Sequence, residues 1–145
     1  MPSLPEIVPS RIADLLKNCS AKRKLSSQTF LFRQGDRQTS LFIVQSGLIE
    51  LSMVVPGRDS VPILSVGPGE LIAWSALLTG QSMTCSAKAT LDSELLELPA
   101  SEIESLAQSD PELAKDFYRW IALGLAHRLT ATRLQLLDLF DHPNA

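Results

Sequence analysis

Residues 66–89 constrain the fold of this chain more than any other stretch. A Gly-Pro-Gly turn at 67–69 leads into an apolar run, which Gly80 ends before an alternating segment begins. We expect a strand, then a short helix over about residues 70–79, then another strand. Glycines let the backbone approach a ligand closely, and the first N–H groups of a helix have no partners within it. The stretch therefore predicts a small anion pocket inside a β-rich domain.

Short β-type segments, each followed by its own turn, recur from residue 22 to residue 98. Residues 49–53 and 83–90 alternate apolar and polar side chains, as half-buried strands do. Gly-Asp and Pro-Gly pairs separate neighbouring segments and are typical of turns. Many short strands at regular spacing indicate a β-sandwich or barrel. The chain is therefore predicted to be mainly β with flanking helices.

Helices are predicted on both sides of the β region. Ser10 is the expected cap of a short helix over residues 10–18. Near the carboxyl end, residues 101–104 have the spacing of a capping box, and Asp110-Pro111 begins a long helix. These two C-terminal helices are predicted to span residues 101–140. A chain of 145 residues suits one domain, which we expect to cover residues 1–145.

The long C-terminal helix carries apolar residues on three sides of its helical wheel, which a single contact surface cannot cover. The residues are Leu113, Phe117, Trp120, Ile121, Leu123, Leu125, Leu129, Leu134 and Leu136. We expect one side to pack on the β region and another to meet a second copy of the chain, giving a homodimer. The alternative is a helix covered on several sides within one domain, although little of the chain remains to cover it.

Composition excludes several classes of protein. The formal net charge of −3 and the sequence pI of about 5.3 do not suit a protein that binds nucleic acid through a basic surface. The N-terminus has no signal-peptide pattern, and Gly, Gln, Ser and Thr interrupt the uncharged stretch 71–87, so no membrane span is expected. Cys19 and Cys85 form no metal-type cluster. We interpret them as reduced core residues of a cytoplasmic protein.

The order of these elements resembles the cyclic nucleotide-binding domain, in particular the sensor half of bacterial regulators of the catabolite-activator and fumarate-nitrate-regulator type. Four segments carry the resemblance: F-L-F-R-Q-G-D at 30–36, L-F-I-V-Q-S-G-L-I-E-L at 41–51, P-G-E-L-I-A-W-S-A-L-L at 68–78 and A-H-R-L-T-A-T-R-L at 126–134. It implies a double-stranded β-helix (a β-roll or jelly roll) over residues 22–98, with a short N-terminal helix, a cassette helix and a long C-terminal helix. Regulators of this kind continue into a DNA-binding domain, which we expect this chain to lack.

The resemblance also implies a ligand site for cyclic AMP or cyclic GMP. In the family, a cassette glutamate contacts the ribose, backbone N–H groups at the helix start hold the phosphate, and an arginine on the next strand pairs with it. The matching cassette positions are Gly69, Glu70, Leu71 and Ile72. The arginine position falls on Ser82 or Met83, neither of which is charged. Thr84 offers a neighbouring hydroxyl, and Thr132 matches a helix position that touches the base.

The missing arginine decides the predicted function. A charge-assisted phosphate contact is worth about 1.5–3 kcal/mol, so its loss weakens binding roughly ten- to a hundredfold. Glu70 would also repel a phosphate that no cation neutralises. We therefore predict a regulatory sensor domain that binds cyclic nucleotides weakly or not at all and acts, as a homodimer, on a partner protein.

Two other functions are alternatives to this one. The first is a structural interaction module whose pocket is vestigial and filled by side chains such as Met83. The second is an enzyme on a similar barrel, such as a metal-dependent cupin, which needs histidines on its strands. Because both histidines, His127 and His142, lie outside the strand region, no enzyme is predicted.

Overall fold

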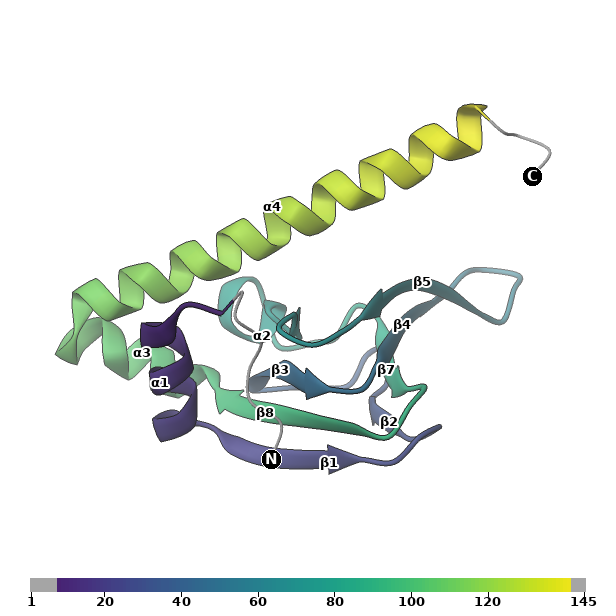
Figure 1. Ribbon diagram of the computed structural model, residues 1–145. Coiled ribbons are helices and arrows are strands. Elements are labelled where there is room, and N and C mark those ends of the chain that lie inside the picture. The colour runs from purple at the N-terminus through teal and green to yellow at the C-terminus, as the bar shows by residue number, and fades with distance from the viewer. Residues whose placement is uncertain (1–7, 142–145) are drawn as a thin grey trace.

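The computed structural model describes residues 8–141, with side chains as far as residue 139. Its elements in chain order are α1 (Ser10–Cys19), β1 (Ala21–Leu25), β2 (Phe30–Phe32), β3 (Ser40–Ser46), β4 (Ile49–Val54), β5 (Ser60–Val66), β6 (Leu71–Ile72), α2 (Ser75–Leu78), β7 (Ser86–Ala89), β8 (Ser93–Pro99), α3 (Ala100–Ser109) and α4 (Pro111–Asp141). Helices thus flank a β-rich centre, as the sequence predicts (Figure 1).

The strands form two antiparallel sheets of four strands each. One sheet has the order β1-β8-β3-β6 and the other the order β2-β7-β4-β5. Strands far apart in the sequence are neighbours in both sheets, since β3 pairs with β8 and β4 pairs with β7. This arrangement is the predicted jelly roll, and it places the cassette segment β6–α2 at the end of the first sheet, beside β3.

Strand β3 separates two hydrophobic cores. Its side chains alternate in direction, and four consecutive residues, Leu41 to Val44, are fully buried. Leu41 and Ile43 belong to a core beneath the helices, whereas Phe42 and Val44 belong to a core between the two sheets. A strand that is buried on both faces reads as a continuous apolar run, which explains the segment L-F-I-V.

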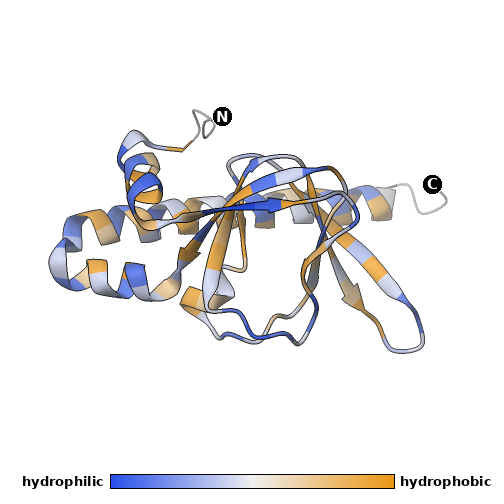
Figure 2. Ribbon diagram, turned by 90° about the horizontal axis from the view of Figure 1, so that it is seen from below, coloured by the Kyte–Doolittle hydropathy of each residue, from blue (hydrophilic) through white to orange (hydrophobic). Residues whose placement is uncertain are grey.

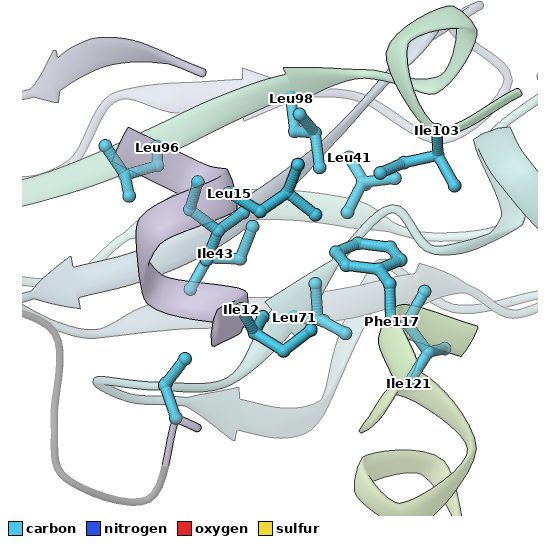
Figure 3. Packing of buried hydrophobic residues seen from close by; sticks show 12 residues of the cluster. Ile12, Leu15, Leu41, Ile43, Leu71, Leu96, Leu98, Ile103, Phe117 and Ile121 are labelled. Carbon is cyan, nitrogen blue, oxygen red and sulfur yellow. The ribbon is translucent and has the colours of Figure 1, made fainter. Parts of the chain in front are cut away.

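Three helices cover the outer face of the first sheet. Ile12 of α1, Ile103 of α3, and Phe117 and Ile121 of α4 pack over it together with residues of β3 and β8 (Figure 3). Only the first half of α4 takes part in this core. Figure 2 shows that hydrophobic residues recur along α4 towards its carboxyl end, and the leucines of its second half are exposed.

Two predicted helix caps are wrong, and one is confirmed. Ser10 lies inside α1, and Pro9 precedes the helix without any side-chain cap; Pro99 takes the same place before α3, so residues 101–104 form no capping box. Both prolines have an extended backbone, and their fixed φ suits the residue just before a helix. Because each proline takes the N-cap position, Ser10 and Ser101 lie in the first turn of their helices. Asp110 does cap α4, because its Oδ1 accepts a hydrogen bond of 3.2 Å from the Leu113 N–H.

We predict that Gly47→Ala lowers the free energy of unfolding by about 2–3 kcal/mol. Gly47 has φ +96°, and a Cβ there would lie 2.7 Å from the Asp92 carbonyl oxygen and clash with the Ser93 hydroxyl. The matched control is Gly57→Ala, which has φ +79° but meets nothing within 4 Å and should cost only about 1 kcal/mol. Urea denaturation measures both variants, and equal losses would contradict this account of the turn.

Candidate functional site

The turn before the cassette is held by backbone hydrogen bonds to β3. Gly69 has φ +85°, and its N–H donates to the Val44 carbonyl oxygen at 2.8 Å. The Val44 N–H in turn donates to the Glu70 carbonyl oxygen at 3.1 Å. The Glu70 carboxylate folds back over the turn and accepts a hydrogen bond of 3.1 Å from the Gly67 N–H. Gly69 therefore serves to bring the turn against β3, and its N–H is already used.

The cassette helix is shorter than predicted and begins later. Leu71 and Ile72 form strand β6, paired with Ile43 and Phe42 of β3. The Leu71 side chain enters the core beneath the helices and the Ile72 side chain enters the core between the sheets. Side chains that alternate in this way belong to a buried strand and not to the first turn of a helix. The prediction that their N–H groups begin a helix is therefore wrong.

Helix α2 begins at Ser75, directly after a strained turn. Trp74 occupies the N-cap position, and Ala73 has φ +62°, a left-handed conformation that costs free energy for any residue with a Cβ. This turn redirects the chain from β6 into α2. The residue at the helix start is therefore Trp74, and Glu70 lies one strand earlier, so Glu70 does not stabilise the N-terminus of α2.

A guanidinium group from α4 reaches the cassette. Arg128 Nη2 donates a hydrogen bond of 2.8 Å to the Leu71 carbonyl oxygen and lies 3.7 Å from Glu70 Oε2. The Arg128 side chain is only 17% exposed, while that of Glu70 is 46% exposed. Within the described residues, the buried Arg128 Nε has no hydrogen-bond partner. The cassette thus has a cation beside its glutamate, and this cation comes from the long helix.

Burial and charge act against each other at Arg128. Burial lowers the pKa of the guanidinium, and the Glu70 carboxylate opposes that shift. Cys85 directly precedes β7 and lies close enough to Arg128 for the guanidinium charge to act on its thiol. Burial raises the pKa of the Cys85 thiol, and Arg128 offsets this rise only in part. Arg128 therefore carries its charge in a partly desolvated position, where a second acceptor would be bound strongly.

The three other candidates before β7 have separate environments. Ser82 is exposed and forms a β-bridge with Arg37, so its backbone is tied to the preceding loop. Met83 is 4% exposed and fills the core between the sheets, as the alternative of a vestigial pocket predicts. Thr84 is exposed.

Thr132 lies one helical turn beyond Arg128 on α4. It is exposed, and its hydroxyl donates a 2.9 Å hydrogen bond to the Arg128 carbonyl oxygen. Of the predicted site residues, the structure thus brings Glu70 and Leu71 together at Arg128. Sequence reasoning missed Arg128, although its place four residues before Thr132, on the same side of a helix, was a usable signal.

Among the residues that the structure describes, neither a metal-ligand cluster nor a membrane-spanning helix is present. Residues 8–139 contain no group of three or more His, Cys, Asp or Glu side chains arranged to hold a metal ion. Among the described helices, none is both long and apolar enough to cross a bilayer. Cys19 and Cys85 are both free thiols.

The fold and the sequence both match known regulators. A crystal structure of the Thermus thermophilus catabolite activator protein superposes with a TM-score of 0.72 at 30% identity, covering 97% of this chain and 63% of that one. The Thermus thermophilus cyclic AMP receptor protein is 33% identical over 79% of this chain and 51% of its own length. The anaerobic regulatory protein of Bacillus subtilis is 27% identical over 86% of this chain and 52% of its own length.

These comparisons concern one part of the regulators. The chain spans about half the length of the two curated relatives, so what the whole proteins do is not transferred with the fold. The family pattern of the cyclic nucleotide-binding domain matches residues 22–110, which is more than half of the chain and includes all of the roll but its first residue, Ala21. This chain therefore belongs to the cyclic nucleotide-binding domain family and corresponds to the sensor domain of catabolite-activator and fumarate-nitrate regulators.

Proposed function

We propose that this chain is a regulatory sensor domain that binds cyclic AMP and cyclic GMP weakly and signals to a partner protein through α4. The observation that carries the proposal is the contact of Arg128 with Leu71 and Glu70, because it joins the cassette to the long helix directly. Any change in the cassette that moves these two acceptors also alters the contacts by which Arg128 attaches α4 to the roll.

Weak nucleotide binding follows because the cation at the cassette already contacts acceptors of the protein itself. Arg128 is the cation at the cassette, and it is engaged with a carbonyl oxygen and a carboxylate. A cyclic phosphate that pairs with Arg128 has to compete with the Glu70 carboxylate for the guanidinium and lies beside a like charge. One charge-assisted hydrogen bond lost to this competition is worth about 1.5–3 kcal/mol. Met83 also occupies space between the sheets.

A structural interaction module is the second candidate function, and Met83 favours it. Its side chain packs among residues of both sheets, including Phe32 and Phe42. A roll interior filled in this way needs no ligand for stability. The two functions differ in whether any ligand changes the position of α4, since a ligand shifts an equilibrium only by its differential affinity for the two states.

The exposed half of α4 supports a homodimer. Leu125, Leu129, Thr132, Leu136 and Leu139 follow one another at intervals of four and three residues, which is the heptad spacing of a coiled-coil seam. Leu129, Leu136 and Leu139 are each more than half exposed in the single chain. Pairing two copies of α4 along this seam would remove that apolar surface from water. A reducing, cytoplasmic location is consistent with the two free cysteines.

Calorimetry tests the nucleotide part of the proposal. We expect cyclic AMP and cyclic GMP to bind the protein with dissociation constants above the micromolar range. The Ser82→Arg variant, which adds a guanidinium at an exposed position where the resemblance places the family's arginine, should bind about ten times more tightly. The control is Arg58→Gln, a change in the β4–β5 turn that should leave binding as it is. Sub-micromolar binding by the unmodified protein would contradict the proposal.

Replacing Arg128 tests the link between cassette and helix. Arg128→Met keeps most of the side-chain volume but removes the hydrogen bond to Leu71, so we expect unfolding to become easier by about 1–2 kcal/mol. Hydrogen exchange in the middle of α4 should accelerate as well. Arg133→Met is the control, since Arg133 is exposed on the same helix and should change stability by less than about 0.5 kcal/mol. Equal effects of the two changes would argue against the link.

The dimer seam is tested by placing charges on it. Leu129→Glu together with Leu136→Glu puts like charges on the seam and should convert dimer to monomer in analytical ultracentrifugation. Leu134→Glu has similar exposure but lies on the opposite side of α4, so it should leave the dimer intact. A protein that is monomeric without any substitution would refute the dimer, as would equal dissociation in both variants.

A further inference from the structure

A cavity of about 370 Å³ lies between α1 and the first half of α4, away from the cassette. Pro9 and Ile12 line it from the α1 side, and Trp120 and Leu123 line it from the α4 side. This volume falls within the range of small-molecule pockets. None of its lining residues belongs to the nucleotide cassette, so the cavity is a site separate from the function proposed above.

Some apolar residues that line the cavity belong to the hydrophobic core, but Leu123 does not. Ile12 is 1% exposed and belongs to the core, and the Trp120 ring lies 5.7 Å from that of Phe117. Leu123, however, is 59% exposed. On the helical wheel it lies roughly 160° from Leu125, so pairing along the proposed seam would leave it uncovered. A concave surface with a half-buried indole and an exposed leucine offers contact area to an apolar ligand.

The charged part of the cavity favours an anion. Arg11 Nη1 and Asp116 Oδ2 form an ion pair at 2.8 Å across the gap between the two helices. Arg119 also lines the cavity, and its exposed guanidinium takes part in no hydrogen bond or ion pair with the described residues. Two arginines and one aspartate leave a net charge of +1. A neutral ligand would leave Arg119 unused, and a cationic ligand would be repelled.

We propose that this cavity binds a small amphipathic carboxylate. Its apolar chain packs on Trp120 and Leu123, and its carboxylate pairs with Arg119. Because α1 and α4 form the two walls, the bound molecule would tie the first half of the long helix to the N-terminal helix. A ligand there would thereby affect the position of α4 at a second place, separate from the contact of Arg128 with the cassette.

Tryptophan fluorescence tests the proposal, since the chain has two tryptophans, Trp74 and Trp120. In a Trp74→Phe background, Trp120 is the sole reporter. We expect decanoate, below its micelle concentration, to change the Trp120 emission in a saturable way in the low millimolar range or below. Decanol should bind at least about five times more weakly, because it cannot pair with Arg119.

Matched variants separate a specific site from general apolar binding. In the same background, Arg119→Gln should weaken decanoate binding about five- to tenfold, whereas Arg133→Gln, on the same helix but outside the cavity, should not. Three results would overturn the proposal: no saturable response to decanoate, equal affinity for decanol, or equal binding by the two variants. A Trp120 response that followed protein concentration and not decanoate would also overturn it and assign the surface to a second copy of the chain.

Discussion

Strand β3 is buried on both faces, and the positions of both cores and of the cassette depend on it. Leu41 and Ile43 anchor the helices, while Phe42 and Val44 fill the roll. The same strand pairs with β6 and exchanges backbone hydrogen bonds with Gly69 and Glu70. The cassette is therefore attached to the most deeply packed strand of the protein. The side of the cassette that does not pair with β3 is contacted by α4.

Arg128 joins the cassette to α4. Its guanidinium contacts the cassette through a carbonyl oxygen of β6 and through the Glu70 carboxylate, while its backbone belongs to the long helix. One side chain therefore neutralises the cassette and positions α4. A cation on a neighbouring strand would stabilise a bound phosphate without involving the helix. Because the cation comes from α4, we propose that ligand binding at the cassette and the position of the helix are parts of one equilibrium, in which a ligand acts through its differential affinity.

The sequence was informative where local patterns determine structure and misleading where a distant contact does. The long helix α4 and its start at Asp110-Pro111 follow from the residues themselves. The segment Leu71-Ile72 could not be assigned by periodicity, because a short apolar run suits a buried strand as well as a helix. Arg128 and Leu71 are 57 residues apart, and only the packing of α4 on the roll brings them together. The cassette segment itself carries no cation, but the expectation that no cation neutralises the site is wrong, because Arg128 of α4 lies beside Glu70.

The central claim is that the Arg128 side chain is held by the cassette and responds to an anion there. Nitrogen-15 NMR of the arginine side chains measures this directly. The account predicts a slowly exchanging Arg128 Nε–H signal that is distinct from those of exposed arginines such as Arg133 and that shifts when cyclic AMP or inorganic phosphate is added at high concentration. An Arg128 signal that averages with those of the exposed arginines, or that ignores both anions while they bind elsewhere, would contradict it.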